Sequence, residues 1–482
     1  MTSLWRRPRA QFCSTRSKFS RSKKFKSPDE GTAIDLDDLE DVKREENDSM
    51  TRQSPPRWRI RVPGAFAHTS FCFLWGGQLI ALIGSAIFPM AIVAILAERD
   101  NMAQALGVVF GARFVGMCLL IILTGVLADR FNKIAMLLSS DVIRCTAVVL
   151  LFLVGTDAPA WLLVTVTFVM GAGESVFQPV YDSTIPSIVP QKDIESANAA
   201  SNMLNSVVQM VGPALGSVLV AGIGVSPALL LNIAAFVAST AGILALWRVA
   251  DAAQLKAAPR DDKTSVLTDA IGGFRIILRI RWLLVLQVVA VLHVLVAVGP
   301  WFVILPVVST ERYDALSLYG TVLSVFAVGG LLGATVAGAI GRKLRAPGAW
   351  ALVGLALFGL ACLSLAFPFP VVVVFALSLV AGAGTQFFDV IKTTAMQRGV
   401  PKKYLGRVFA LDFFASFVMM PAGQMMAGFL IADTGRIPFI ATFGGVFVVV
   451  TSLVPIVLHS VRSLDRYPQP SQEGEPSALE VP

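Results

Sequence analysis

The stretch "GVLADRFNK", residues 125–133, interrupts a very apolar part of the chain. The twenty residues before it, "ALGVVFGARFVGMCLLIILT", carry one charge, and the seven after it, "IAMLLSS", carry none. The stretch itself places three charges, Asp129, Arg130 and Lys133, within five residues. Its meaning depends on the class of protein to which the whole chain belongs.

Composition indicates that class. Of the 482 residues, 55% are hydrophobic and only 15% are charged, against roughly 25% in soluble domains, and the mean hydropathy is +0.70. Apolar stretches of about 20 residues recur, each long enough to cross a hydrocarbon core of about 30 Å as a helix. The sequence therefore predicts an all-α membrane protein with twelve transmembrane helices. The predicted spans are 72–97, 104–128, 134–155, 160–185, 199–224, 228–248, 283–308, 316–340, 347–367, 371–396, 406–432 and 438–459.

The distribution of basic residues predicts the orientation. One side of the predicted membrane carries both tails and every second loop. Together with the adjoining helix ends, these segments contain 23 Lys or Arg residues, whereas the loops on the other side contain three. Because cytoplasmic loops are rich in Lys and Arg, both termini are predicted to be cytoplasmic in a cell (plasma or inner) membrane. The net charge of +8 then reflects this topology rather than a nucleic-acid partner.

The same reading divides the chain into five parts. They are an N-terminal tail (1–69), a first six-helix bundle (70–248), a cytoplasmic inter-bundle loop (249–282), a second six-helix bundle (283–460) and a C-terminal tail (461–482). In the first tail, nine basic residues precede ten acidic ones. Two interpretations remain open: a disordered, self-neutralising tail, or a basic block that binds anionic lipid headgroups of the bilayer.

The two halves contain an internal repeat. "GAGESVFQPVYDSTIPSIVP" (171–190) aligns without a gap with "GAGTQFFDVIKTTAMQRGVP" (382–401), in the fourth predicted helix of each half. Pro213 and Pro421, in the following helices, also correspond within a few residues. Weak internal symmetry is typical of transporters that bind their substrate between two repeats.

The opening stretch resembles the signature loop of the major facilitator superfamily, which it matches at Gly125, Asp129, Arg130 and Lys133. It departs at Asn132, where the family has Gly. Asn tolerates a left-handed turn better than other non-glycine residues, so this departure should cost little.

A second motif, "VGPALGS" (211–217), resembles the Gly-Pro motif of the antiporter branch through Gly212, Pro213 and Gly216. The stretches "QLIALIGSAIF", "SSDVIRC", "ESANAASN" and "YLGRVFAL" are similar to the drug–proton antiporters that include macrolide efflux pumps and the enterobactin exporter. The resemblance implies two pseudo-symmetric six-helix bundles, a monomer without cofactors, and exchange of a small molecule for protons. The Arg that this family's drug exporters often carry in helix 4 is absent from 160–185.

Charges inside the predicted spans are candidate functional residues, because each costs about 2.5–3.5 kcal/mol at the centre of a bilayer on insertion scales. Asp141 and Arg144 are three residues apart on one helix, a spacing that favours an ion pair. Asp389 and Lys392 share this spacing on the tenth helix, which lines the cavity in the family. For this second pair, structural and functional roles remain equally open.

Glu174, in the middle of the fourth helix, is the first candidate for proton coupling. A carboxylate shielded from water can take a proton on one side of a membrane and release it on the other. The alternative is an ion pair with Arg113 or Arg144, and Arg113 is also a candidate for receiving an anionic substrate group. Asp412 is a second coupling candidate. His293 either titrates near neutral pH or is a packing residue.

Asp129 is expected to lie at the cytoplasmic end of the second helix and to face the start of the eleventh, "KKYLGRVF" (402–409). Free backbone N–H groups, the positive end of the helix dipole and Arg407 would hold the carboxylate there. This latch would link the two bundles when the cytoplasmic side is closed. In the alternative, the charges of the loop are only topology signals.

These features predict a secondary active transporter that exports a small amphiphilic compound, such as a drug, a macrolide or a siderophore-like molecule, by proton antiport with alternating access. No GxxxxGK[ST] motif is present, and no nucleophile–base or metal cluster predicts an enzyme. A permease for a lipid-related or metabolite substrate, and a membrane sensor that does not transport, remain alternatives.

Overall fold

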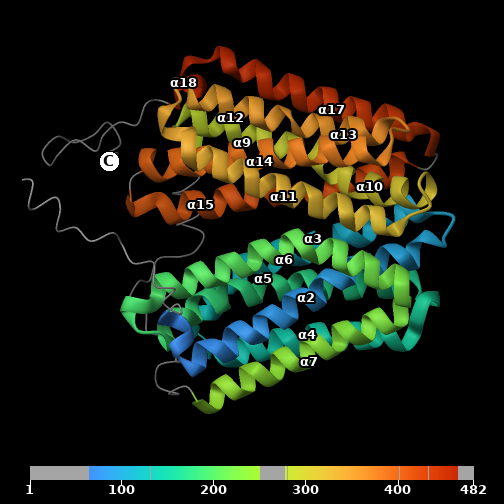
Figure 1. Cartoon of the computed structure of the whole chain (residues 1–482), viewed down its shortest axis with the longest axis vertical. Coiled ribbons are helices and arrows are strands. Elements are labelled where there is room, and N and C mark those ends of the chain that lie inside the picture. Colours follow the sequence, from blue (N-terminus) through green and yellow to red (C-terminus); the bar gives the residue numbers. More distant parts are fainter. Residues whose placement is uncertain are drawn as a thin grey trace, which may run out of the picture. The chain divides into compact units, whose positions relative to one another are not determined.

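The computed structural model describes residues 64–130, 132–249, 277–278, 280–400, 402–431 and 434–464, and the elements in this part of the chain are all helical (Figure 1). The predicted tails and the inter-bundle loop lie almost wholly outside these ranges. In the first half, the α-helices are α2 (Thr69–Ala97), α3 (Met102–Arg130), α4 (Lys133–Val154), α5 (Ala160–Ile188), α6 (Ile194–Ile223) and α7 (Val225–Val249). In the second half, they are α9 (Arg281–His293), α10 (Gly299–Glu311), α11 (Leu316–Ile340), α12 (Pro347–Ala356), α13 (Phe358–Ala366), α14 (Val371–Gly399), α15 (Lys402–Phe417), α16 (Met420–Leu430), α17 (Ile437–Leu453) and α18 (His459–Ser463).

Eleven helical segments of the described chain are long and apolar enough to cross a membrane. In one of them, α9 and α10 are joined by a π-helix, Val294–Val298. In another, α12 and α13 are separated only at Leu357. Eleven of the twelve predicted spans correspond to these segments; the ends agree within a few residues except at the start of Gln191–Ile223 and at the end of Met102–Leu120.

The twelfth predicted span, 406–432, is formed by two shorter helices. The chain leaves the helical path at Val418 and Met419, between α15 and α16. Pro421 lies in the first turn of α16, where its missing N–H costs nothing, whereas inside a continuous helix its ring would clash with the carbonyl four residues earlier. The proline thus explains why this span is broken.

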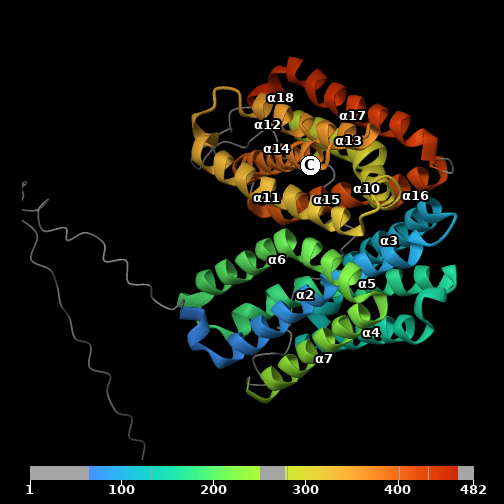
Figure 2. The same ribbon diagram turned by 45° about the vertical axis from the view of Figure 1, so that its right-hand side comes forward.

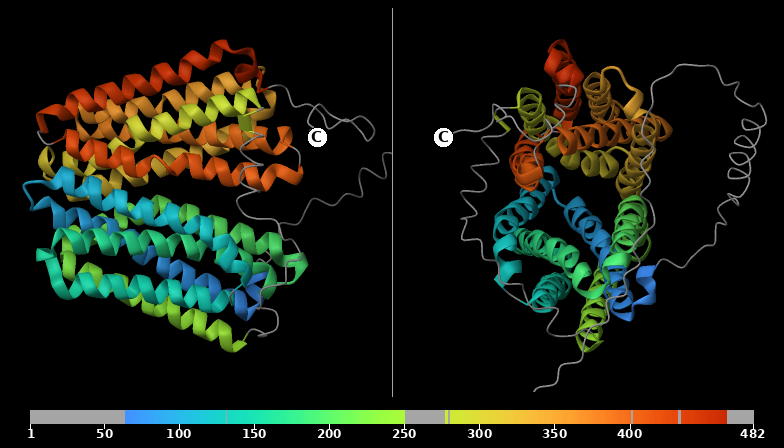
Figure 3. Two further views of the ribbon diagram at one scale, coloured as in Figure 1. Left: turned by 180° about the vertical axis from the view of Figure 1, so that it is seen from behind. Right: turned by 90° about the vertical axis from the view of Figure 1, so that its left-hand side faces the viewer.

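The helices form two bundles. Within the first, α3 packs on α5, α2 on α7, and α4 on both α5 and α7; within the second, α14 packs on α11, α12 and α13, and α13 on α17. The right view of Figure 3 looks along the helices and shows the helices of each half gathered in a separate group. The predicted two-bundle membrane fold is confirmed.

Glycine contacts show the pseudo-symmetry of the bundles at the residue level. A Cβ atom at Gly171 would collide with the backbone carbonyl of Arg113, so this glycine lets α5 approach α3 closely. At the repeat position, a Cβ at Gly382 would collide with the carbonyl of Phe326, where α14 meets α11. Close approach through small residues is the usual packing device of membrane helices. A second equivalent pair of close contacts joins Gly116 to the carbonyl of Phe168 in the first bundle and Gly329 to the carbonyl of Leu379 in the second.

The two bundles touch through α6 on α11 and through α16 on α3 (Figure 2). The α3–α4 connection, which contains the signature loop, marks one end of the bundles; we call it the signature-loop end and the opposite one the far end. Gly320 of α11 lies against the carbonyl of Pro213, and Gly107 of α3 lies against that of Gln424. These contacts lie in the halves of the helices nearer the far end, so the bundles are closed there.

Candidate functional site

A cavity of about 640 Å³ lies between the bundles. Its walls come mainly from α2, α3, α5 and α6, and the second bundle adds side chains of α10, α11 and α16. The lining is mostly apolar and aromatic, with Phe110, Phe114, Phe177, Phe302 and Leu323 among its members. Its polar uncharged members include Gln78, Gln178, Asn205, Gln209 and Gln424. A cavity with this mixture suits an amphiphilic molecule.

The first ion pair of the cavity joins Arg113 of α3 to Glu174 of α5. Arg113 Nη2 donates to Oε1 at 2.8 Å and to Oε2 at 2.9 Å, and Nε donates to Oε2 at 3.2 Å. Both side chains are about one quarter exposed and line the cavity. Each oxygen of Glu174 is therefore engaged by the guanidinium in a two-point, charge-assisted contact.

The second ion pair joins Arg144 and Asp141 on α4, with the predicted spacing of three residues. Ser239 of α7 donates to Asp141 Oδ2 at 2.7 Å. The Arg144 guanidinium lies 4.9 Å from the ring centroids of both Phe177 and Phe236. Cation–π contact on both sides and a buried carboxylate fix this guanidinium at the back of the cavity, which it also lines.

Two glycines of the repeat motif on α5 make room for these arginines. Gly171 accommodates the backbone of Arg113, and a Cβ at Gly173 would collide with the side chain of Arg144. The "GAGE" sequence of α5 therefore places Glu174 beside two cationic side chains.

In the cavity, cationic hydrogen-bond donors are free, whereas the carboxylate that could accept hydrogen bonds is already paired. Among the described residues, neither Arg113 Nη1 nor Arg144 Nη1 makes a hydrogen bond, although both guanidinium groups line the cavity. Glu174, the one acid among the lining residues, has both oxygens occupied. The guanidinium groups can donate to a ligand, and Gln424 Oε1, which has no hydrogen-bond partner among the described residues, can accept from one.

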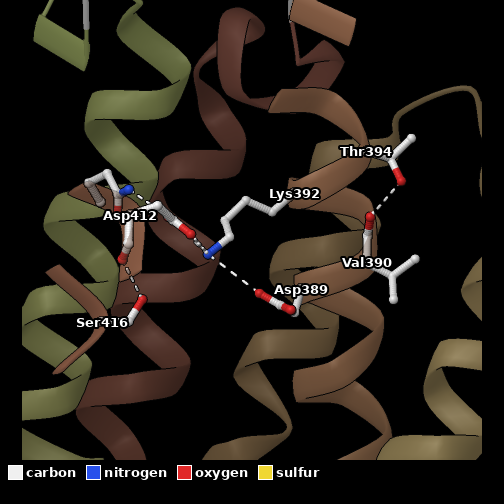
Figure 4. Close-up of polar contacts among 7 residues, drawn as sticks. Asp389, Val390, Lys392, Thr394, Asp412 and Ser416 are labelled. Carbon is white, nitrogen blue, oxygen red and sulfur yellow. Dashed lines mark hydrogen bonds and ion pairs between the residues drawn. The ribbon is translucent and has the colours of Figure 1, made fainter. Parts of the chain in front are cut away.

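A third charged cluster lies in the second bundle (Figure 4). Lys392 of α14 is buried and contacts Asp412 of α15 and Asp389 on its own helix. The sequence anticipated the pair with Asp389 but not the stronger contact with Asp412. None of these three residues is among the side chains that line the cavity described above.

His293, the last residue of α9, is placed for packing. Its Nε2 lies 2.7 Å from Thr451 Oγ1, its ring makes an edge contact with Phe447, and it is not part of the cavity wall. The π-helix that follows it begins at the next residue. The structure thus places this histidine as a hydrogen-bonded core side chain, one of the two alternatives above.

In the signature loop, Asn132 begins α4. Its backbone is extended, with φ −63° and ψ 125°, and its side chain accepts hydrogen bonds from the N–H groups of Ile134 and Ala135. The backbone at Asn132 is therefore not left-handed, and Asn serves here as a helix N-cap. Lys133 donates to the Ser183 carbonyl at 2.7 Å and to Ser187 Oγ at 3.1 Å, which ties α4 to the end of α5.

The remaining residues of the signature loop and latch lie outside the described side chains. Gly125, Asp129 and Arg130 are in the last turns of α3, and Arg407 is near the start of α15. The backbones of α3 and α15 come into contact, but whether Asp129 reaches Arg407 stays a prediction.

The Gly-Pro motif lies where α6 meets two neighbours. A Cβ at Gly212 or at Gly216 would collide with Ala86 of α2, so both glycines allow a close helix contact. Just after Pro213, the N–H of Ala214 donates to Ser324 Oγ of α11 at 3.0 Å. Because this bond crosses between the bundles, the motif belongs to the closed far end rather than to the polar wall of the cavity.

Several polar residues of these sites escaped the sequence reasoning. Gln287 contacts Asp412, Ser239 contacts Asp141, and Gln424 lines the cavity. A lone amide within an apolar helix is a recognisable signal for Gln287 and Gln424. In the described residues, no group of three or more His, Cys, Asp or Glu side chains forms a metal site.

Comparison with known proteins agrees with this geometry. The chain is 24% identical over 404 residues to macrolide efflux protein A of Streptococcus pyogenes, covering 82% of this chain and 97% of that protein. It is 25% identical over 409 residues to the multidrug efflux pump Tap of Mycobacterium tuberculosis, covering 81% and 94%.

Solved structures support the fold. A bacterial homologue of the iron transporter ferroportin matches with a TM-score of 0.64 and 17% identity, covering 80% of this chain and 98% of that one. The nucleoside transporter NupG matches with a TM-score of 0.62 and 11% identity, covering 80% and 98%. The family model for the Major Facilitator Superfamily matches residues 74–424. The chain therefore belongs to the Major Facilitator Superfamily of multi-pass membrane transporters.

Proposed function

We propose that this chain exports a small amphiphilic compound from the cell in exchange for protons, by alternating access. The observation that carries the proposal is the cavity between the bundles, closed at the far end, with apolar walls and two fixed ion pairs. The likeness to macrolide efflux protein A and to Tap supports export as the direction. The charge bias of the loops supports a cytoplasmic signature-loop end, with both termini on that side.

The free donors of Arg113 and Arg144 indicate what the substrate presents to the cavity. In a site shielded from water, a donor that the protein leaves unpaired is best satisfied by an acceptor of the ligand. The substrate class that fits is an amphiphile whose polar end carries oxygen acceptors or an anionic group.

Respiring inverted membrane vesicles test the proposal, because their interior becomes acidic and proton antiport then drives uptake of a substrate. The probes are labelled erythromycin and two related xanthene dyes of opposite charge, fluorescein and rhodamine 6G. We expect uptake that requires the chain and is abolished by a protonophore, with fluorescein preferred to rhodamine 6G.

Vesicles without the chain provide the background. Equal uptake in both vesicle preparations for all three probes would contradict the proposal, and uptake that persists with the protonophore would contradict proton coupling. Preference for rhodamine 6G would contradict the assigned polarity of the site.

A further inference from the structure

The charged cluster of the second bundle carries an uncompensated charge. Lys392 Nζ lies 3.1 Å from each oxygen of Asp412 and 3.5 Å from Asp389 Oδ1 (Figure 4). Gln287 Nε2 donates to Asp412 Oδ1 at 2.6 Å. One ammonium group thus serves two carboxylates, whereas each acid of the two cavity pairs has an arginine of its own.

The two carboxylates of the cluster are unequal. The side chain of Asp412 is 12% exposed and has close partners on both oxygens. That of Asp389 is 51% exposed and has one longer contact, to Lys392. When both are ionised, the poorly compensated charge is therefore that of Asp389. A charge without a close partner is unfavourable at membrane depth, and a single bound proton removes it.

Few other charges act on this cluster. The helices that pack on α14 and α15 are α3, α9, α11, α12 and α13. Their described side chains that can be charged near neutral pH are Arg113, held by Glu174, Arg281, exposed at the start of α9, and His293, bonded to Thr451. On α14 itself, Arg398 lies in the last turn. In the described part of the chain, Lys392 is therefore the cation that faces Asp389.

The side chain of Asp389 is half exposed and lies in the part of α14 nearer the signature-loop end. It lies ten residues before the end of α14, about 15 Å from the signature-loop end at 1.5 Å per residue. Gln386 and Thr393 lie three residues before it and four after it, on the same half-buried face of the helix. A polar face of this kind suits a water-filled gap rather than lipid.

We propose that Asp389 takes up and releases the coupling proton, and that Lys392 and Asp412 are positioning residues for it. The inference deepens the proposed antiport by naming its proton site. When Asp389 is ionised, the Lys392 ammonium is shared between both carboxylates. When an oxygen of Asp389 binds a proton from water, the ammonium is left to Asp412 alone and the cluster is neutral. Release of that proton to water restores the sharing.

This exchange connects two helices. Asp389 and Lys392 belong to α14, whereas Asp412 belongs to α15, six residues before the break at Val418. A stronger bond between Lys392 and Asp412 holds α15 more firmly to α14. The proton state of Asp389 is thereby linked to a helix that also contacts α3 of the other bundle.

Infrared spectroscopy of the purified full-length protein in lipid nanodiscs tests the site without a transported probe. Aspartate is labelled with carbon-13 at its carboxyl group, and spectra are recorded as the pH is varied. We expect a labelled C=O band of a protonated acid that disappears as the pH rises. The band should be missing from Asp389→Asn and present in Glu174→Gln and in Asp157→Asn, an exposed loop control.

Two further variants separate positioning from mere packing. Lys392→Met should move the disappearance of the band to higher pH, because the ammonium no longer favours ionised Asp389. Lys392→Arg should restore the position found in the unmodified chain. Thermal unfolding identifies any variant that has lost its fold.

The assignment is overturned if the unmodified chain shows no titrating aspartate band, or if the band survives in Asp389→Asn. These outcomes leave the transport assay untouched. Conversely, absence of uptake in the vesicle experiment would defeat the proposed function while a titrating Asp389 remained in the spectra.

Discussion

Glu174 of α5 receives three hydrogen bonds from a single guanidinium, that of Arg113 on α3, on the wall of the inter-bundle cavity. The sequence marks Glu174 as the first candidate for the coupling proton. Its geometry instead favours a permanent ion partner of Arg113, because protonation would forfeit a two-pronged, charge-assisted contact. On this geometry we assign the Arg113–Glu174 pair to the proposed substrate site and the cluster around Asp389 to the proposed proton site.

Glu174→Gln should therefore change probe selectivity and leave proton coupling in place. Without its carboxylate partner, Arg113 presents a full positive charge to the cavity, so binding of fluorescein should strengthen by about tenfold, or ~1.4 kcal/mol. Fluorescence titration of the purified protein measures this change, with rhodamine 6G as the oppositely charged control. If the variant lost proton-driven uptake but still exchanged dye in vesicles without a proton gradient, the coupling proton would instead be placed on Glu174.

Arg144 should be important for stability. Asp141 is fully buried beside it, so Arg144→Leu leaves an uncompensated carboxylate and should destabilise the protein by about 3–5 kcal/mol. The double variant, with Asp141→Asn in addition, should recover most of this loss. Unfolding in detergent provides the comparison. Equal destabilisation by the single and the double variant would show that packing of the side chain, rather than the charge pair, matters.

Gly320 should control closure of the far end. A leucine there would collide with the carbonyl of Pro213 and the hydroxyl of Ser217, so Gly320→Leu should favour the form in which this end is open. A cysteine introduced at Ser317 should then react several-fold faster with a membrane-impermeant maleimide added to intact cells. Gly222→Leu is the matched control, since no neighbouring atom lies within 4 Å of its Cβ position. Unchanged reactivity would argue against a gate at α6 and α11.

Asp129→Asn tests the latch. The variant should insert normally, because acidic residues contribute little to orientation, but transport should fall strongly and the form open at the signature-loop end should gain population. Membrane fractionation, probe uptake and accessibility of a cysteine placed in the cavity at Asn205 report these three properties. Normal transport would leave the charges of the loop as topology signals only.

Contacts within one helix were predictable from the sequence. Because residues three apart share a helix face, the spacing of Asp141 and Arg144 was enough to predict their pair. The spans followed from apolar length, and the broken one contained its cause in Pro421.

Contacts between helices were not predictable in the same way. Spacing assigned Lys392 to Asp389, but the closer partner, Asp412, comes from another helix and depends on how α14 and α15 rotate against each other. Asn132 shows a different limit. Its residue type suits both a left-handed turn and an N-cap, and the start of α4 selects the cap.

The glycine contacts place Arg113 and Phe326 at equivalent positions of the two bundles, and this has a consequence for how a substrate lies during transport. The backbone scaffold is repeated, yet one copy presents a charge to the cavity while the other buries a ring against Trp301 and Phe358. The two copies of the scaffold therefore differ in chemistry at this position, where the first is charged and the second is apolar. We expect the head group of an amphiphile to lie against Arg113 and its tail against aromatic side chains that line the cavity, such as Phe114 and Phe302, so each molecule would travel in one fixed orientation.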